Sequence, residues 1–127
     1  MAAERGGRGT RVLRVAEGVR QELASLIADE VRDPGAAGAV VTRVEMANDL
    51  KSAHVYVRLL ENGDDKSRRA QVVDALGRAT GLLRREVTQR LALRFAPQLR
   101  FSYDEGLDRT MRVEELLAEI EADKRSG

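Results

Sequence analysis

The chain has 127 residues, with 43% hydrophobic and 34% charged side chains and a formal net charge of +1. This composition is typical of one soluble globular domain with a modest core and argues against a disordered chain. The absence of cysteine excludes disulfides, thiolate metal sites and cysteine nucleophiles, and it fits a reducing cytoplasm. No apolar run reaches the ~20 residues of a membrane helix, and the first ten residues lack the apolar core of a secretory signal.

The small net charge hides four blocks of alternating sign. Residues 1–20 carry +3, residues 21–66 carry −4, residues 67–100 carry +6 and residues 101–127 carry −4. The two basic blocks are therefore the candidate contacts for an anionic partner, and the overall isoelectric point is a poor guide to binding.

The first segment predicts a basic arm followed by a helix. Residues 1–9 are rich in arginine and glycine and lack apolar anchors, so we expect a flexible arm. Thr10 is a candidate helix cap. Apolar residues then recur at spacings of three and four as far as Val31, which predicts an amphipathic helix that ends at Asp33-Pro34.

Two strands follow, over residues 40–46 and 52–60, and they are close enough in sequence to pair as an antiparallel hairpin. Alternation in the first strand predicts one face made of Val40, Thr42, Val44 and Met46. In the second strand, His54 alternates to the face opposite the core stripe, so we expect it on the solvent side of the sheet.

The second half of the chain predicts a helical stripe over residues 72–91, a strand over 99–103 and a short acidic helix near the end. The order of elements indicates an α+β domain in which helices cover one face of a three-stranded sheet. We expect the arm at residues 1–9, the domain at 10–106 and the acidic helix and tail at 107–127.

The stretch RATGLLRRE (78–86) interrupts the helical stripe with residues that weaken a helix. One interpretation is a packing glycine or a bend that follows the sheet. The other is a helix–turn–helix elbow, in which a second helix starts near Leu82 and the amides of residues 81–84 are unpaired. Such a helix start attracts phosphate, and Arg84 and Arg85 in that turn make sense if an anion binds there.

The order of elements, with a small-residue elbow between the middle helices, is that of a type II KH domain, which clamps nucleic-acid backbone at this elbow. Here the loop reads Ala-Thr-Gly and lacks the usual G-x-x-G. The chain resembles the ribosome-binding factor A family, in which Ala-x-Gly replaces that motif. Four stretches carry the resemblance: EVRDP (30–34), VTRVEMANDLKSAHVYV (41–57), ATGLLRR (79–85) and LRFAPQLRFSYDEGLDRTMRVEELL (93–117).

The resemblance implies a non-catalytic assembly factor. Such a factor binds the immature small ribosomal subunit and its ribosomal RNA, near the processed beginning of that RNA, and assists late maturation and RNA processing, above all in the cold. It leaves with the help of a ribosome-associated GTPase. We therefore expect a cytoplasmic monomer with no membrane partner, no cofactor, no metal and no catalytic residue.

The predicted RNA contacts combine the elbow with the basic residues around it and on the first helix. Arginine suits this role because its planar guanidinium binds phosphate with two hydrogen bonds and stacks on bases. The chain has only four aromatic residues (Tyr56, Phe95, Phe101 and Tyr103), which argues against a sheet that stacks bases. The predicted contacts are Arg11, Arg14, Arg78, Ala79, Thr80, Gly81, Arg84, Arg85 and Arg90.

Three other classes of protein compete with this interpretation. An enzyme is disfavoured for two reasons. The single histidine has no carboxylate or thiolate at the spacing of a metal site, and the sequence contains no P-loop or nucleophile elbow. A DNA-binding helix–turn–helix protein fits the elbow but not the three strands. A protein-interaction module remains open through the acidic residues 111–123. Salt dependence separates these classes, because an RNA binder weakens steeply with salt.

Overall fold

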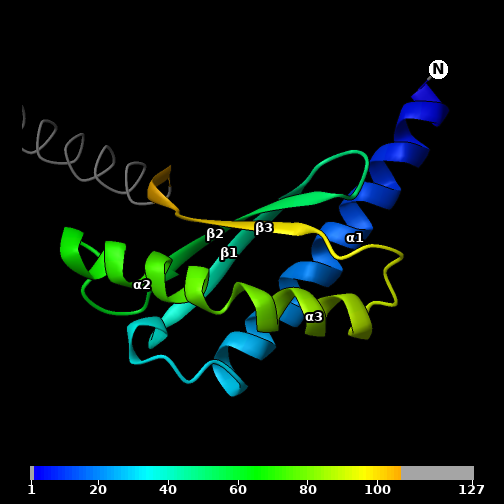
Figure 1. The fold of residues 1–127 in the computed structure, drawn as a ribbon. Coiled ribbons are helices and arrows are strands. Elements are labelled where there is room, and N and C mark those ends of the chain that lie inside the picture. Colours follow the sequence, from blue (N-terminus) through cyan, green and yellow to red (C-terminus); the bar gives the residue numbers. More distant parts are fainter. Residues whose placement is uncertain (1, 107–127) are drawn as a thin grey trace, which may run out of the picture.

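The computed structural model describes the backbone of residues 2–106 and the side chains from residue 9 onward (Figure 1). The predicted acidic helix and tail over residues 107–127 lie outside the described residues. In chain order the elements are α1 (Ala2–Asp29), the 3-10 turn η1 (Pro34–Ala36), β1 (Ala39–Met46), β2 (Ser52–Leu59), α2 (Lys66–Arg78), α3 (Thr80–Arg90) and β3 (Gln98–Tyr103).

The first helix begins earlier than predicted. α1 starts at Ala2, whereas the sequence predicts a cap at Thr10. Residues 2–9 contain no proline, so nothing in them blocks the helical hydrogen bonds. The predicted arm thus falls within the bounds of the helix. The division of the chain into arm, domain and tail stays a prediction.

The first helix also ends earlier than predicted. The sequence predicts a stop at Asp33, before Pro34, but the last helical residue is Asp29. The carbonyl of Leu26 accepts the backbone N–H groups of Glu30 and Val31, at 2.7 and 3.2 Å, and this shared acceptor closes the helix. Asp33 instead caps η1, because its carboxylate accepts the N–H of Gly35 at 2.9 Å.

β1 and β2 pair antiparallel, as predicted, but β1 contains a β-bulge at Thr42 that the sequence pattern does not reveal. The extra residue shifts the alternation by one, so Val41 and Val44 both pack on the core while Val40 is 39% exposed. The predicted face of alternate residues is therefore wrong at its first position. The Thr42 hydroxyl donates to the buried carboxylate of Asp104 at 2.6 Å, which ties β1 to the end of β3.

β3 pairs parallel to β2, and the strand order is β1-β2-β3. β3 is therefore an edge strand that follows a crossover through α2 and α3. A parallel strand needs such a crossover, because a short turn can only reverse the chain. With α1 and the hairpin in front, this is the order of a type II KH-like domain with a break between its middle helices, as predicted.

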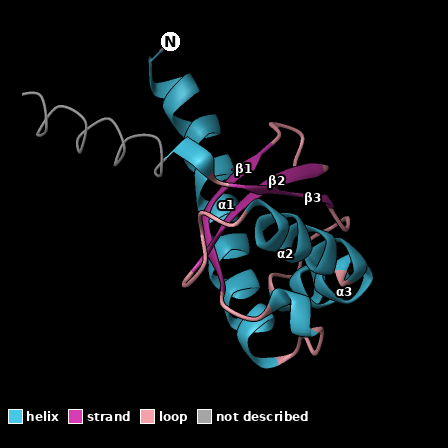
Figure 2. Ribbon diagram, turned by 90° about the vertical axis from the view of Figure 1, so that its left-hand side faces the viewer, coloured by secondary structure: helices cyan, strands magenta, loops and turns pink. Residues whose placement is uncertain are grey.

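The three helices share one core on one face of the sheet. Figure 1 shows α2 and α3 following one another below the strands, and Figure 2 separates them from the strands in a side view. His54 alternates to the other face, as predicted, and is half-buried there. The most deeply buried side chains come from all three helices and the central strand: Val19, Leu23, Leu26, Val55, Val57, Val72, Leu76, Leu83 and Val87.

Candidate nucleic-acid interface

A one-residue break separates α2 from α3. α2 ends at Arg78 and α3 begins at Thr80, with Ala79 between them at φ −87° and ψ 2°. The Ala79 N–H donates to the carbonyl of Leu76 at 3.1 Å, and the Ala79 carbonyl accepts from the N–H of Leu83 at 3.0 Å. Ala79 thus belongs to the hydrogen-bond ladder of both helices, and the chain changes direction within one residue.

The second helix of the pair starts earlier than predicted, at Thr80 and not near Leu82. The amide of Leu83 is already hydrogen-bonded within the ladder, so the predicted set of unpaired amides at 81–84 shifts to 80–82. No side chain caps this helix start, and its first turn contains no acidic residue. The positive end of the α3 dipole is therefore not neutralised by the first turn of α3 itself.

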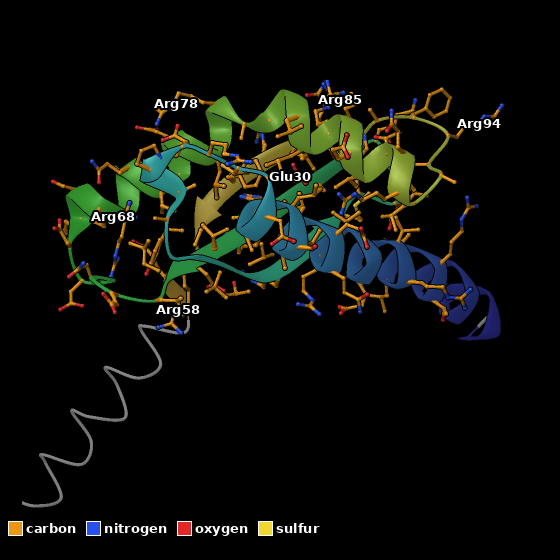
Figure 3. All side chains as sticks on the ribbon, turned by 90° about the horizontal axis from the view of Figure 1, so that it is seen from below. Glu30, Arg58, Arg68, Arg78, Arg85 and Arg94 are labelled. Carbon is orange, nitrogen blue, oxygen red and sulfur yellow. The ribbon has the colours of Figure 1, made fainter. Side chains whose placement is uncertain are left out.

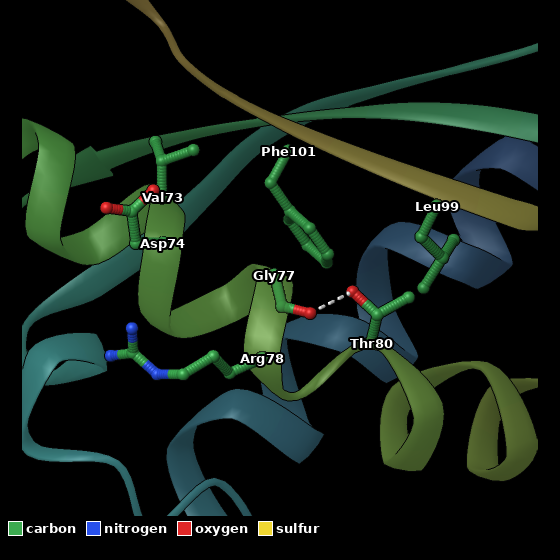
Figure 4. A pocket seen from close by; sticks show the side chains of 7 residues that line it. All are labelled: Val73, Asp74, Gly77, Arg78, Thr80, Leu99 and Phe101. Carbon is green, nitrogen blue, oxygen red and sulfur yellow. Dashed lines mark hydrogen bonds between the residues drawn. The ribbon is translucent and has the colours of Figure 1, made fainter.

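The side chain of Thr80 closes the preceding helix. Its hydroxyl donates to the carbonyl of Gly77 at 2.7 Å and lies 3.3 Å from that of Leu76 (Figure 4). The last carbonyls of a helix lack intrahelical partners. Thr80 has poor helix propensity, but its hydroxyl satisfies two of these carbonyls at the point where the next helix begins.

Gly81 is exposed on the surface and is not a packing glycine. A Cβ atom built on Gly81 meets nothing within 4 Å, and the same holds for Gly77 one turn earlier. The interpretation in which Gly81 lets two helices cross closely is therefore wrong. What the missing side chain leaves bare is the N-terminal turn of α3.

A cavity of about 510 Å³ lies beside the break, between α2, α3 and the edge strand β3. Figure 4 shows the side chains of Leu99 and Phe101 reaching from β3 toward Gly77 and Thr80. The cavity thus has an apolar wall on the strand and a polar backbone wall at the helix break. Its lining residues are Val73, Asp74, Gly77, Arg78, Thr80, Leu99 and Phe101.

Five of these lining residues are not among the predicted contacts: Val73, Asp74, Gly77, Leu99 and Phe101. The sequence predicts only that Leu99 and Phe101 lie in a strand over residues 99–103. No local pattern indicates that β3 is the edge strand beside the helix break, because strand order is set by the crossover. The carboxylate of Asp74 is exposed and adds a negative charge to a cavity that is otherwise suited to an anionic chain.

Arg78 lies at the break but is held by an acid from a distant loop. Its Nε donates to the Asp33 carboxylate at 2.9 Å, while 63% of its side chain stays exposed. This hydrogen bond is the largest cause that lowers the pKa of Asp33 below its ordinary value, and it also raises the pKa of Arg78. A phosphate at the break has to compete with Asp33 for this guanidinium.

Arg84 is used by the fold. Its Nε donates to the carbonyl of Pro97 at 2.9 Å and its Nη2 to that of Ala96 at 3.1 Å. The side chain is half-buried and fixes the connection between α3 and β3. The structure thus gives this predicted contact a clear structural role at the base of the elbow.

Arg85 and Arg90 differ in how firmly they are paired. Arg85 is 63% exposed, and its guanidinium lies 3.7 Å from the carboxylate of Glu86. Arg90 is 36% exposed and lies 3.5 Å from Glu22 and 3.7 Å from Glu86. An exposed ion pair contributes little, so Arg85 is the more available of the two cations. Figure 3 shows Arg78 and Arg85 along the same edge of the molecule.

Arg11 and Arg14 are not brought to the break. Both are exposed on α1, and Arg11 lines a separate cavity of about 150 Å³ at the turn between β1 and β2. Figure 1 places this part of α1 away from the junction of α2 and α3. These two arginines therefore form a second basic region and do not extend the first.

Neither a metal-binding cluster nor a membrane-spanning helix is found in the part of the chain that the structure describes. No group of three or more His, Asp or Glu side chains has the geometry to hold a metal ion among residues 9–106, whose side chains the structure describes. Among the same residues, no helix combines the length and apolar character needed to cross a membrane. The Nε2 of His54 lies 2.7 Å from the Ser102 hydroxyl, so that ring nitrogen already has a partner.

The fold and the open helix break together define a KH-like α+β domain. Solved structures with this fold include the crystal structure of ribosome-binding factor A from Thermus thermophilus, with a TM-score of 0.59 and 23% identity over 71% of this chain and 92% of that one. A Thermotoga maritima protein described as a putative ribosome-binding factor A has a TM-score of 0.56 and 26% identity over 77% and 87% of the two chains.

Sequence comparison names the family. The family model "Ribosome-binding factor A" matches residues 11–117. Ribosome-binding factor A from Sorangium cellulosum is 47% identical over 92% of this chain and 93% of its own length, and the Moorella thermoacetica protein is 43% identical over 86% and 88%. The chain therefore belongs to the ribosome-binding factor A family. A third similar structure (TM-score 0.54, 25% identity, 69% of this chain and 90% of that one) is the Thermus thermophilus protein as fitted into a cryo-EM map of a 30S–RbfA complex.

Proposed function

We propose that this protein is a ribosome assembly factor that binds the immature small ribosomal subunit through its ribosomal RNA. Membership of the ribosome-binding factor A family supports the ribosomal partner, and a relative has been fitted into a 30S complex. The observation that carries the RNA contact is the open first turn of α3, where Gly81 leaves the surface bare and no acid caps the helix.

In the proposed complex, an RNA backbone follows the cavity beside the elbow (residues 78–81). Amides 80–82 donate to a phosphate, and the helix dipole favours its charge. Arg85 provides an exposed cation one turn further on, and Arg78 adds a second when the phosphate displaces Asp33. Leu99 and Phe101 form the apolar wall against which a sugar or base lies.

The finer parts of the proposal follow the family. We infer that the factor acts late in subunit maturation and in processing of the RNA, that its action matters most in the cold, and that a ribosome-associated GTPase helps its release. It acts as a cytoplasmic monomer and performs no catalysis itself. Arg11 and Arg14 on α1 contact a second RNA segment in this proposal.

The first experiment is co-sedimentation of the purified protein with purified small and large subunits, at low and at moderate salt. We expect selective binding to the small subunit that weakens as salt rises. Arg85→Gln should weaken this binding, whereas Lys66→Gln should not. Lys66→Gln removes the same charge at the first residue of α2, whereas the break follows the last residue of that helix. Equal binding to both subunits would reduce the protein to a general RNA binder, and no binding to either would refute the proposal.

A further inference from the structure

The face of the sheet that points away from α1, α2 and α3 presents aromatic and cationic side chains in register. One cross-strand row contains Glu45, His54 and Arg100, and the next contains Arg43, Tyr56 and Ser102. Arg58 follows on the central strand. We name this surface the outer face and define it by Arg43, His54, Tyr56, Arg58, Arg100 and Ser102.

The centre of the outer face is a stack of planar groups. The rings of His54 and Tyr56 are stacked with centroids 4.4 Å apart and 15° between their planes. The guanidinium carbon of Arg43 lies 3.9 Å from the centroid of the Tyr56 ring. The Ser102 hydroxyl lies 2.7 Å from His54 Nε2 and fixes the orientation of the imidazole. The stack is therefore held in place before any ligand arrives.

This stack changes the expectation drawn from composition. Four aromatic residues in the whole chain argue against a sheet that stacks bases. The two faces of the Tyr56 ring are covered by His54 and by Arg43, but the imidazole of His54 keeps one open face on the central strand. Half-exposed planar side chains on a central strand are the feature on which sheet-type RNA-binding domains stack unpaired bases. A stacked base needs no particular sequence, because every base has a π face.

The charges of the outer face suit a phosphate backbone. Two acidic side chains adjoin it, and both lie against Arg43: the carboxylate of Glu45 at 2.6 Å and that of Asp104 at 3.8 Å. Arg58 and Arg100 lie on the two neighbouring strands beyond this pair, and Arg100 is exposed. Positive charge on both sides of a planar stack favours a chain that carries bases and phosphates over a partner that is only apolar or only acidic.

We propose that the outer face is a second RNA-binding surface that takes unpaired nucleotides, with a base against the open face of the His54 imidazole and phosphates at Arg58 and Arg100. This inference rests on the proposed function, since it assumes an RNA partner. The two surfaces are distinct, because in Figure 3 Arg58 lies at the opposite edge of the molecule from Arg78 and Arg85. The protein then binds a single strand on the sheet and an RNA backbone at the elbow.

The test measures fluorescence anisotropy with two probes, a single-stranded oligoadenylate and an abasic oligonucleotide of equal length that keeps all phosphates. Tyr56→Leu retains apolar bulk but removes the ring that supports the His54 imidazole from behind. It should weaken oligoadenylate binding by about fivefold or more and leave abasic binding unchanged. Arg100→Gln should weaken binding of both probes. Lys66→Gln is the matched control for lost charge. A melting curve of each variant checks that it folds.

A second measurement does not depend on any variant. Ultraviolet crosslinking of the wild-type protein to a 4-thiouridine oligonucleotide, and to the small subunit, should give crosslinked peptides from residues 52–59 of β2. Crosslinks confined to the elbow, together with wild-type affinity of Tyr56→Leu for both probes, would overturn the inference. Crosslinks from β2 to a ribosomal protein in place of RNA would overturn it as well.

Failure of this inference is distinguishable from failure of the proposed function. If Arg85→Gln weakens binding to the small subunit but Tyr56→Leu and Arg100→Gln do not, the elbow stands and the outer face is refuted. If the wild-type protein binds neither subunit nor either oligonucleotide, the proposed function fails and the outer-face surface fails with it.

Discussion

At the scale of single residues, Gly81 separates helix stability from access to the helix start. Glycine in a helix costs about 1 kcal/mol relative to alanine, and a Cβ at this position meets no neighbour. We therefore expect Gly81→Ala to raise the free energy of unfolding by up to about 1 kcal/mol. It should also weaken binding to the small subunit, because a Cβ in a helix tilts toward the N-terminus, where the amides of residues 80–82 receive phosphate.

Urea unfolding and co-sedimentation measure these two effects of Gly81→Ala. Gln89→Ala is the matched control, since Gln89 is exposed on the same helix but far from its first turn. The control should be at least as stable as the wild type and bind normally. A stabilised Gly81→Ala protein with unchanged affinity would mean that phosphate does not approach this turn.

The Asp33–Arg78 pair predicts a pH dependence of stability and of binding. The guanidinium lowers the pKa of Asp33 below its ordinary value, so the charged form is favoured in the folded protein. The stabilisation is complete above the ordinary carboxyl pKa and is lost as the pH falls through the lowered one. Between pH 5 and 3 the unfolding midpoint of the wild type should therefore fall more steeply than that of Asp33→Asn.

The same Asp33→Asn variant tests whether Arg78 is restrained. An asparagine keeps an oxygen to accept the N–H of Gly35, so η1 should stay capped. Arg78 loses its charged partner, and binding to the small subunit at neutral pH should become tighter. Glu17, whose pKa is lowered mainly by Arg20, titrates in both proteins and is thereby controlled. Weaker binding by Asp33→Asn would show that the pair positions Arg78 and does not restrain it.

At the scale of elements, the connection from α3 to β3 depends on Arg84. Its guanidinium donates to the carbonyls of Pro97 and Ala96. Arg84→Met keeps the apolar stem but leaves both carbonyls without this donor. The free energy of unfolding should therefore fall by about 1–2 kcal/mol. Arg85→Met is the neighbouring control and should change stability by less than about 0.5 kcal/mol.

The two arginine variants separate the effect on stability from the effect on binding to the small subunit. Urea unfolding should rank Arg84→Met as the less stable protein, whereas co-sedimentation at a temperature where both are folded should rank Arg85→Met as the weaker binder. The reverse order in co-sedimentation would mean that Arg84 leaves the carbonyls of the loop to contact RNA.

The spacing of apolar residues predicted the helices and strands, and the helix-weakening residues at 79–81 predicted the break, because each of these features depends on neighbouring residues in the sequence. Periodicity failed at Val40, since a bulge adds a residue without changing the alternation of residue types. Periodicity also gave no sign of the structural role of Arg84, because its partners are backbone carbonyls that a sequence does not display. Its contact with RNA stays a prediction. The sequence predicts that Leu99 and Phe101 lie in a strand. Only the parallel pairing of β3 with β2 brings them to the helix break.

At the scale of the whole molecule, charge is segregated by surface. The basic block at residues 67–100 contains the elbow and α3, and Figure 3 shows Arg78, Arg85 and Arg94 along one edge. With a formal net charge of +1, the protein as a whole attracts RNA weakly. Binding to the subunit must therefore come from local contacts, and the number of phosphates in those contacts is measurable.

Salt dependence counts these contacts. The logarithm of the binding constant falls with the logarithm of salt concentration by about 0.7–0.9 for each phosphate neutralised. Arg78→Gln combined with Arg85→Gln should therefore reduce the magnitude of the slope for the small subunit by about 1–2, whereas Lys66→Gln should leave it unchanged. Titration at several salt concentrations gives both slopes. A double variant that binds more weakly with an unchanged slope would show that these arginines support the elbow structurally without neutralising phosphate, because counterion release follows charge contacts and not fold.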